Sequence, residues 1–206
     1  VEYLVFTSAA FLFICGAALI VPFAEVYTLG ISDVSYKRPL FGMLMCLNQF
    51  LFCVRLPYHM LVDAAGHFKQ TRNGAIFEAF LNVIVSVTLV IKFGLIGVTI
   101  GTFCALLFRT LQYSIYASKN ILQRKYRFVA EHIALSIVQA VIVSFVLRLI
   151  YVPIFDSYIN WILYAIEVAI VVVIVLIISS AIFYKQELRI LRRKAKVFWE
   201  RRSKAN

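Results

Sequence analysis

DAAGHFKQTRNGAIFEAFLNVIVSVTLVIKFGLIGVTIGT, the stretch from Asp63 to Thr102, holds the clearest structural pattern in this sequence. It begins in a short basic loop and continues into an apolar segment that carries Glu78, Asn82 and Ser86. Because these three residues are four apart, they lie on one face of a helix. The segment therefore predicts a membrane helix with a polar stripe.

The same stretch turns at Gly94 and starts a second apolar segment with Gly97 and Gly101. Glycine suits a tight turn because it lacks a Cβ, and two glycines four residues apart let a helix approach its neighbour closely. We expect a hairpin of two membrane helices with a glycine seam. The remaining segments are interpreted as its neighbours in one bundle.

Composition places the chain in lipid rather than in water. Of its 206 residues, 63% are hydrophobic, and the mean hydropathy is +0.90. A soluble domain of this length cannot bury so much apolar surface. We expect an all-α membrane protein whose transmembrane helices form one bundle over residues 1–184, each helix taking roughly 20 residues to cross the bilayer. The six predicted spans lie near 3–28, 39–63, 74–92, 95–117, 128–152 and 158–184.

The excess of basic residues is concentrated at the end of the chain. The formal net charge is +11, and +7 of it lies between Lys185 and Asn206, where nine Lys and Arg residues stand against two Glu residues. Apolar residues at helical spacing predict a basic amphipathic tail over 185–206 that lies on membrane lipids. A basic flank beside a span is typical of the cytoplasmic face, and it disfavours nucleic acid as a partner.

The Lys and Arg residues outside the spans, those of the tail included, predict the orientation of the bundle. Fifteen lie on the side of the tail and three on the opposite side; the fifteen are Lys69, Arg72, Lys119, Arg124, Lys125, Arg127 and the nine of the tail, and the three are Lys37, Arg38 and Lys92. Short cytoplasmic connections carry the larger share of Lys and Arg. We therefore expect a multi-pass protein with its C-terminus in the cytoplasm.

Neither a metal site nor a catalytic site is expected. The four cysteines fall in apolar segments without a CxxC pair, and the three histidines are scattered, which disfavours disulfides and metal ligation. The sequence contains no G-x-S-x-G elbow, no H-E-x-x-H motif and no phosphate-binding glycine loop. The connections are too short for a catalytic domain. We expect no enzyme activity, no metal and no cofactor.

A polar face of the second span indicates a candidate site. Asn48, Arg55, His59 and Asp63 share this face at helical spacing, and Arg55 lies about 12 Å from the cytoplasmic end of the span. An Arg at mid-membrane costs about 2.5–3.5 kcal/mol on insertion scales, so it requires a partner or water. Two interpretations stay open. Arg55 pairs with Asp63 or Glu78, or it faces a water-filled cavity.

A second arginine lies at a similar depth in the fourth span, where Arg109 shares its face with Gln112. We expect both arginines in one layer. This coincidence predicts a cationic, substrate-binding cavity; its candidate residues are Arg55, Arg109, Asn48, His59 and Gln112. The candidates for ion pairing or ion coupling are the acidic residues Glu78, Asp63, Glu25 and Glu167.

The hairpin and its surroundings resemble a known family. The motifs GHFKQT, AIFEAFLNVIVSVTLV and KFGLIGVTIGT, followed by Arg109-Thr110, are similar to the C-terminal lobe of Wzx-type polysaccharide flippases. These flippases belong to the multidrug/oligosaccharidyl-lipid/polysaccharide exporter superfamily. Upstream, VPFAEVYTLGISDVSY and RLPYHMLVDAAG resemble that family's seventh and eighth helices. The resemblance covers about residues 20–125.

The resemblance implies a fold of two six-helix bundles around a central cavity, of which this chain supplies the second. The chain begins at Val1 directly before its first span, and we expect a fragment that lacks the N-terminal lobe. The family moves undecaprenyl-diphosphate-linked oligosaccharide to the outer leaflet of the bacterial plasma membrane by alternating access. Arg55 and Arg109 match positions where the family carries basic residues, and Glu78 matches a recurrent acid.

Two other functions are compatible with part of the pattern. A cation-coupled multidrug exporter of the same superfamily would carry acids deep in its cavity, whereas Glu78, Glu131 and Asp63 lie near the cytoplasmic end. An enzyme that acts on lipid-linked glycans would need a large external loop. We therefore expect a lipid-linked oligosaccharide flippase for O-antigen, capsule or exopolysaccharide synthesis.

Overall fold

The computed structural model of the chain describes residues 2–31, 38–124, 127–149 and 155–183. In these ranges, six helices are long and apolar enough to cross a membrane, which confirms the predicted all-α bundle. They are α1 (Glu2–Tyr27), α2 (Pro39–Ala64), α3 (Phe68–Phe93), α4 (Leu95–Tyr116), α5 (Arg127–Leu149) and α6 (Tyr158–Phe183), with a π-helical turn at Ala117–Ile121 after α4. The predicted tail over 185–206 lies outside the described residues.

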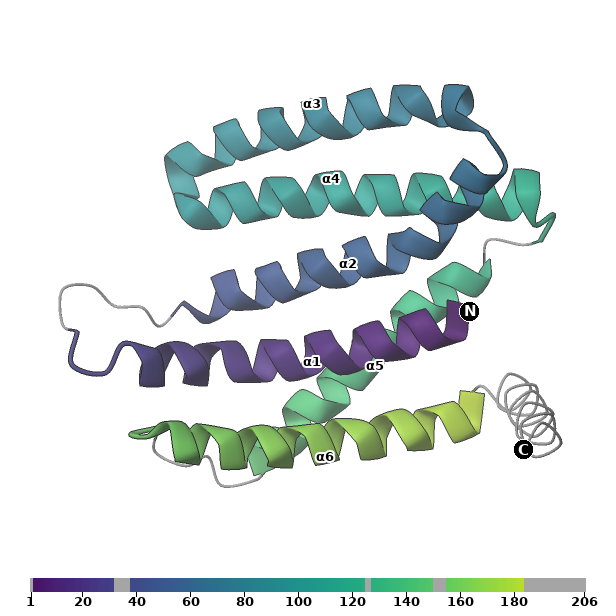
Figure 1. Cartoon of the computed structure of the whole chain (residues 1–206). Coiled ribbons are helices and arrows are strands. Elements are labelled where there is room, and N and C mark those ends of the chain that lie inside the picture. Colours follow the sequence, from purple (N-terminus) through teal and green to yellow (C-terminus); the bar gives the residue numbers. More distant parts are fainter. Residues whose placement is uncertain (1, 32–37, 125–126, 150–154, 184–206) are drawn as a thin grey trace, which may run out of the picture.

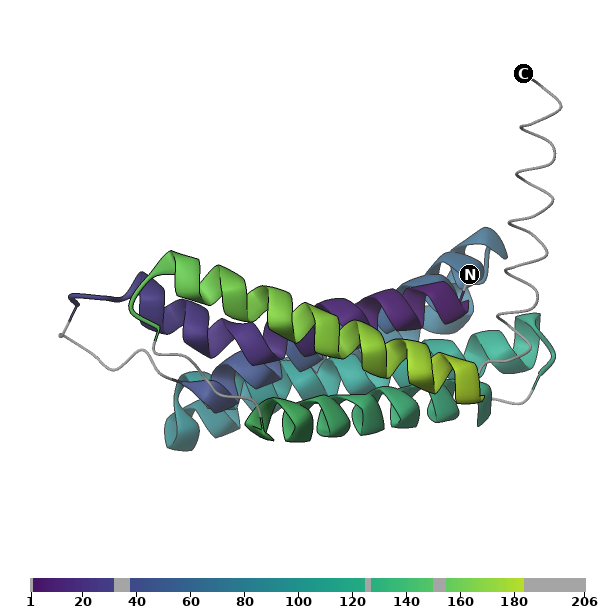
Figure 2. The ribbon, with the colours of Figure 1, turned by 90° about the horizontal axis from the view of Figure 1, so that it is seen from below.

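Five of the helices follow one another as a layer in the order α3, α4, α2, α1 and α6 (Figure 1). Helix α5 lies to one side of this layer and packs against α6 and α1 (Figure 2). Helix α4 separates α3 from α2, so these three helices form one half of the molecule. The candidate site lies in this half.

The tightest packing in the bundle is the hairpin of α3 and α4. Gly94 joins the two helices with a φ of +56°, a conformation that residues with a Cβ rarely adopt. A Cβ on Gly97 would lie 2.7 Å from the backbone nitrogen of Val90, and one on Gly101 would lie 2.7 Å from that of Ser86. The predicted glycine seam is therefore confirmed, since both positions of α4 touch the α3 backbone.

Helix α3 starts earlier than the sequence predicts. The predicted loop ran to about residue 73, whereas the structure has a connection only at 65–67 and a helix from Phe68. The first residues of α3 are polar, with Lys69 and Arg72 among them, and hydropathy alone therefore excludes them from a span. Lys, Gln and Arg are nevertheless good helix formers. The correction places these basic side chains on a helix beside the site.

The buried core lies away from α3. Phe6, Val54, Tyr58, Val143 and Val168 belong to one cluster that joins α1, α2, α5 and α6. Gln139 of α5 donates a hydrogen bond to Ser179 of α6 at 2.6 Å. Helix α3 buries only Thr71 and Gly74. It is therefore held mainly by α4 and presents most of its apolar surface outward.

The basic connections lie at one end of the bundle. The α2–α3 connection, the residues that follow α4 and the first turn of α1 share the end at the right of Figure 1. We call this the basic end because Lys69, Arg72 and Arg124 lie there. At this end Arg124 forms an ion pair with Glu2 of α1.

Candidate functional site

Arg55 of α2 points across α4 toward α3. Its Nη1 donates a hydrogen bond to Oε1 of Glu78 at 2.8 Å, and its side chain is 15% exposed. The guanidinium also lies 5.1 Å from the ring centroid of Phe52, one turn earlier on α2. Of the two partners that the sequence left open for Arg55, the structure selects Glu78.

Arg109 of α4 reaches the same carboxylate from the other side. Its Nε lies 3.3 Å from Oε2 of Glu78. Its Nη1 donates to the carbonyl of Thr71 at 2.9 Å and to Oε1 of Gln112 at 2.6 Å. Its Nη2 donates to the hydroxyl of Tyr113 at 2.8 Å, and the guanidinium lies 4.2 Å from that ring's centroid. Arg109 is 5% exposed.

One carboxylate thus serves two arginines. Arg55 and Arg109 lie in one layer, as their depths in the sequence predict, and Glu78 lies between them. Two guanidinium charges against one carboxylate leave the cluster with a net charge of about +1, since Arg stays protonated in proteins. We call these three residues the arginine cluster. Its excess positive charge favours a further anion.

The two arginines differ in how many of their N–H groups are used. A guanidinium has five N–H donors. Arg109 directs its donors to four polar partners, whereas Arg55 has one acceptor among the described residues, the Glu78 carboxylate. Arg109 is therefore the more fully satisfied cation, and Arg55 retains N–H donors that have no acceptor among the described residues. The sequence, which places both arginines at equal depth, does not distinguish them.

A pocket of about 310 Å³ opens beside the arginine cluster at the basic end. Its lining includes Arg109 and, on α2, the predicted residues His59 and Asp63, whose Nδ1 and Oδ2 atoms lie 3.5 Å apart. Lys69 and Arg72 of α3 also line it. The sequence pattern predicts a loop for these two cations and does not indicate them as site residues. Their spacing of three, on a polar but helix-forming stretch, is the signal that identifies them.

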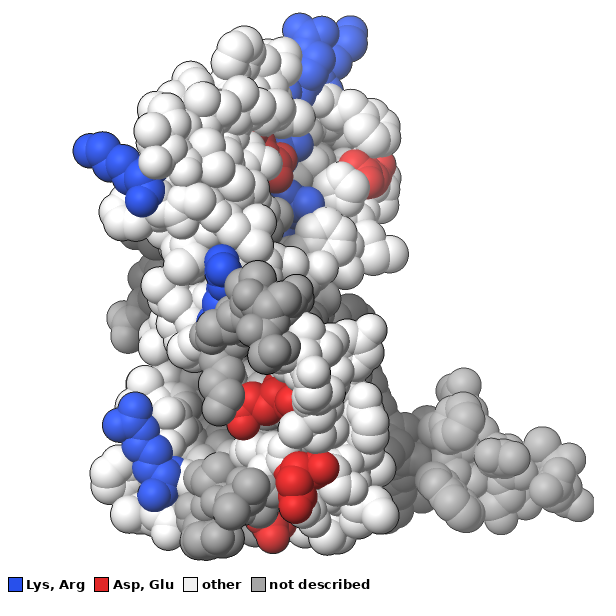
Figure 3. Space-filling view, turned by 90° about the vertical axis from the view of Figure 1, so that its left-hand side faces the viewer, with Lys and Arg blue, Asp and Glu red and all other residues white. Residues whose placement is uncertain are grey.

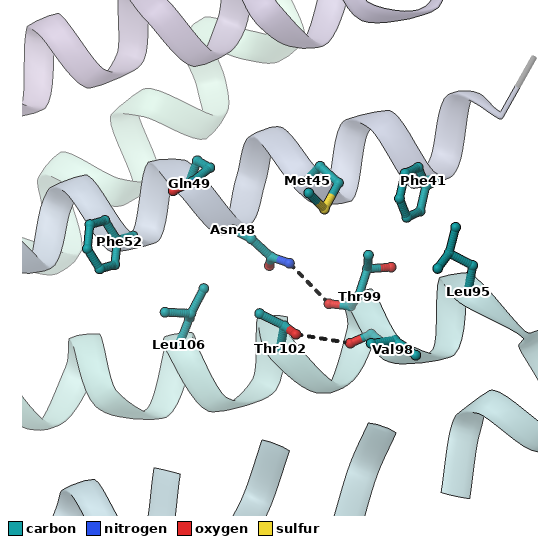
Figure 4. Close-up of a pocket in the computed structure, with 10 residues that line it drawn as sticks. All are labelled: Phe41, Met45, Asn48, Gln49, Phe52, Leu95, Val98, Thr99, Thr102 and Leu106. Atoms are coloured by element: carbon teal, nitrogen blue, oxygen red, sulfur yellow. Dashed lines mark hydrogen bonds between the residues drawn. The ribbon is translucent and has the colours of Figure 1, made fainter. Parts of the chain in front are cut away.

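A second, larger hollow lies between α2 and α4. It has a volume of about 560 Å³ and is lined by five side chains from each helix. Phe41 and Leu95 lie at one end of it and Phe52 and Leu106 at the other (Figure 4). We call it the α2–α4 groove. Because Phe52 also contacts Arg55, the groove ends next to the arginine cluster.

Asn48, a predicted substrate-binding residue, lies in the wall of this groove. Its Nδ2 donates to the carbonyl of Thr99 at 3.2 Å and links α2 to α4 (Figure 4). Its Oδ1 is buried and has no hydrogen-bond partner among the described residues. Asn48 is 5% exposed, so its first role is to hold the two helices together.

Gln112, also predicted to bind substrate, instead supports Arg109. Besides accepting its hydrogen bond, the Gln112 side chain occupies the space that a Cβ on Gly74 would fill. Gly74 of α3 is therefore another position where the close approach of α3 and α4 requires glycine. The lining of neither the pocket nor the groove includes Gln112.

The structure does not bring the other two predicted acids to the cluster. Glu25 lies near the end of α1 opposite the basic end, and Glu167 lies on α6. In the end view of Figure 3, acidic atoms flanked by basic atoms lie in a hollow of the upper part, where α2, α3 and α4 are. Other acidic side chains gather in the lower part, over α1 and α6.

The described residues contain no group of three or more His, Cys, Asp and Glu side chains placed to hold a metal ion. Comparison of the chain with protein-family models, with curated proteins and with solved structures finds no match. The resemblance to polysaccharide flippases therefore stays a prediction. The site's own geometry supplies the argument for a function.

Proposed function

We propose that this chain is one lobe of a transporter that flips undecaprenyl-diphosphate-linked oligosaccharide across a bacterial plasma membrane. The observation that carries the proposal is the arginine cluster, in which Glu78 neutralises one of two membrane-embedded arginines and Arg55 keeps free donors. A diphosphate supplies the missing negative charge, and Arg binds phosphate oxygens bidentately. The sequence motifs around the hairpin support the same function.

The pocket at the basic end supports an anionic cargo. Lys69 and Arg72 line it together with Arg109, against the single carboxylate of Asp63. Clefts lined by charge of one sign attract ligands of the other sign. In the proposed orientation the basic end faces the cytoplasm, where lipid-linked oligosaccharides are assembled. A diphosphate would enter through this pocket and reach Arg55 next.

The alternative of a cation-coupled exporter is less well supported. Coupling to protons or sodium requires a carboxylate that can exchange its cation. Glu78 is the acid nearest to the middle of the site, and it is engaged by two arginines. Each of its two carboxylate oxygens already contacts a guanidinium, so a coupling cation would have to displace an arginine.

Deletion of the gene that encodes this chain tests the proposal. We expect surface polysaccharide to be lost and lipid-linked oligosaccharide to accumulate on the cytoplasmic leaflet, because synthesis continues without translocation. Extracted glycolipid and surface polysaccharide are quantified in the same cells. A plasmid copy of the gene should restore both. Normal surface polysaccharide in the deletion strain, or loss of polysaccharide without accumulated glycolipid, would exclude a flippase.

A further inference from the structure

The α2–α4 groove and the arginine cluster form one continuous path along two helices. On α2, the groove residues Phe41, Met45 and Phe52 share a helix face with Arg55. On α4, Leu95 and Leu106 share a face with Arg109. The spacings of three, four, seven and eleven residues keep each row on one side of its helix. The path changes from apolar to cationic at Phe52, whose ring contacts the Arg55 guanidinium.

The groove has the composition of a hydrocarbon site. Its side walls are formed mainly by Phe, Leu, Met and Val side chains, and polar groups are confined to Asn, Gln and Thr side chains without charge. From Phe41 to Phe52 it extends about 16 Å along α2, at the helical rise per residue. A volume of about 560 Å³ lies within the range of ligand pockets. This length accommodates the first few isoprene units of a polyprenyl chain.

The positive charge next to the Phe52 end of the groove favours an anionic amphiphile. Arg55 and Arg109 carry two positive charges, and Glu78 carries one negative charge. Arg55 also keeps unused N–H donors. A ligand that satisfies both parts has a phosphate head at Arg55 and an apolar chain beyond Phe52. A neutral lipid would leave the cluster uncompensated, and a small soluble anion would leave the groove unfilled.

We propose that the α2–α4 groove binds the proximal isoprene units of a polyprenyl diphosphate while its diphosphate lies at Arg55. This inference rests on the proposed function and adds a chain-binding subsite to it. The direction agrees with the bilayer. Arg55 lies about 14 Å from the end of α2 at the basic end, and the groove continues from there toward the opposite end. A lipid in the leaflet of the basic end points its chain the same way.

Filling the groove without touching the cations tests the inference. Thr102→Phe and, independently, Val98→Phe place a ring among the groove side chains of α4; Thr102 is partly exposed and Val98 is exposed. Val87→Phe is the matched control, because Val87 lies on α3 and is 57% exposed. The purified chain in detergent is titrated with labelled undecaprenyl diphosphate and, separately, with inorganic diphosphate, which has no isoprene chain. Dioleoyl phosphatidylglycerol is added as a competitor.

We expect each groove variant to weaken the binding of undecaprenyl diphosphate at least about tenfold, since even two buried methylene groups contribute that much affinity. Inorganic diphosphate should bind the groove variants and the control within about twofold of the wild type, because it has no chain to place in the groove. Arg55→Ala should weaken the binding of both diphosphates. Unchanged affinity of both groove variants for undecaprenyl diphosphate would overturn the groove assignment alone, as would equal competition by phosphatidylglycerol. Failure of the wild-type chain to bind either diphosphate would overturn the proposed function as well.

Discussion

Arg55 of α2 lies 2.8 Å from Glu78 of α3, although each of these helices packs most closely against α4, which lies between them. The contact therefore closes a ring of three helices around the arginine cluster. Its energetic role follows from the surroundings, because removing one partner from a membrane-embedded ion cluster leaves the other charges uncompensated.

Glu78→Gln should destabilise the chain by at least about 2 kcal/mol, because two arginines then lose their shared counter-charge within the membrane. The free energy of unfolding is measured by titration with SDS in mixed micelles. Glu167→Gln is the matched control, since Glu167 is exposed on α6 and its replacement should change stability by less than about 0.5 kcal/mol. Equal stability of Glu78→Gln and the wild type would show that the cluster does not support the fold.

Replacing each arginine separately should distinguish their roles. Arg109→Ala leaves the Thr71 carbonyl, Gln112 and Tyr113 without their partner, and we expect a loss of about 3–5 kcal/mol. Arg55→Ala leaves Glu78 still paired with Arg109, so about 1 kcal/mol should be lost. The same SDS titration measures both. A larger loss for Arg55→Ala than for Arg109→Ala would contradict the assignment of Arg109 as the structural cation.

Much of this arrangement is predictable from residue spacing alone. The four-residue steps of Asn82 and Ser86 place both on one face of α3, and Ser86 donates a hydrogen bond to Asn82 at 3.1 Å. The equal depths of Arg55 and Arg109 follow from counting residues along two spans. These features are local, because helical periodicity fixes them without knowledge of the partner helix.

The remaining features depend on how the helices pack, and spacing does not determine that. The sequence leaves Asp63 and Glu78 open as partners of Arg55. Only the packing of α3 against α4 decides that Glu78 is the partner. The α2–α4 groove exists because α3 packs on another side of α4. The polar first turns of α3 were missed for a different reason, since hydropathy marks the limits of a span and not those of a helix.

The seam between α3 and α4 should tolerate no methyl group at Gly101. A Cβ there would lie 2.7 Å from the Ser86 nitrogen and 2.9 Å from its Cα, so α3 must move. We expect Gly101→Ala to cost about 1–3 kcal/mol, as overpacking does. Gly16→Ala is the control, since the nearest atom to its Cβ is Cys46 Sγ at 3.4 Å, an ordinary contact. Similar stability of the two variants would contradict the close approach at Gly101.

The orientation can be tested by labelling single cysteines. In a variant whose four native cysteines are replaced, Lys69→Cys should be protected from a membrane-impermeant maleimide on intact cells, and Lys92→Cys should react. The two positions lie at opposite ends of α3, so one helix provides both the test and its control. Permeabilised cells should label both positions. The reverse pattern on intact cells would show that the basic end faces outward.

The central claim is that Arg55 holds the anionic head of a lipid-linked oligosaccharide during its passage across the membrane. The most direct measurement is the fraction of lipid-linked oligosaccharide in the outer leaflet of cells that carry Arg55→Ala in the intact gene, with membrane levels of the protein measured in parallel. We predict that translocation is lost while the protein remains in the membrane at the wild-type level. Wild-type translocation by Arg55→Ala would contradict the account.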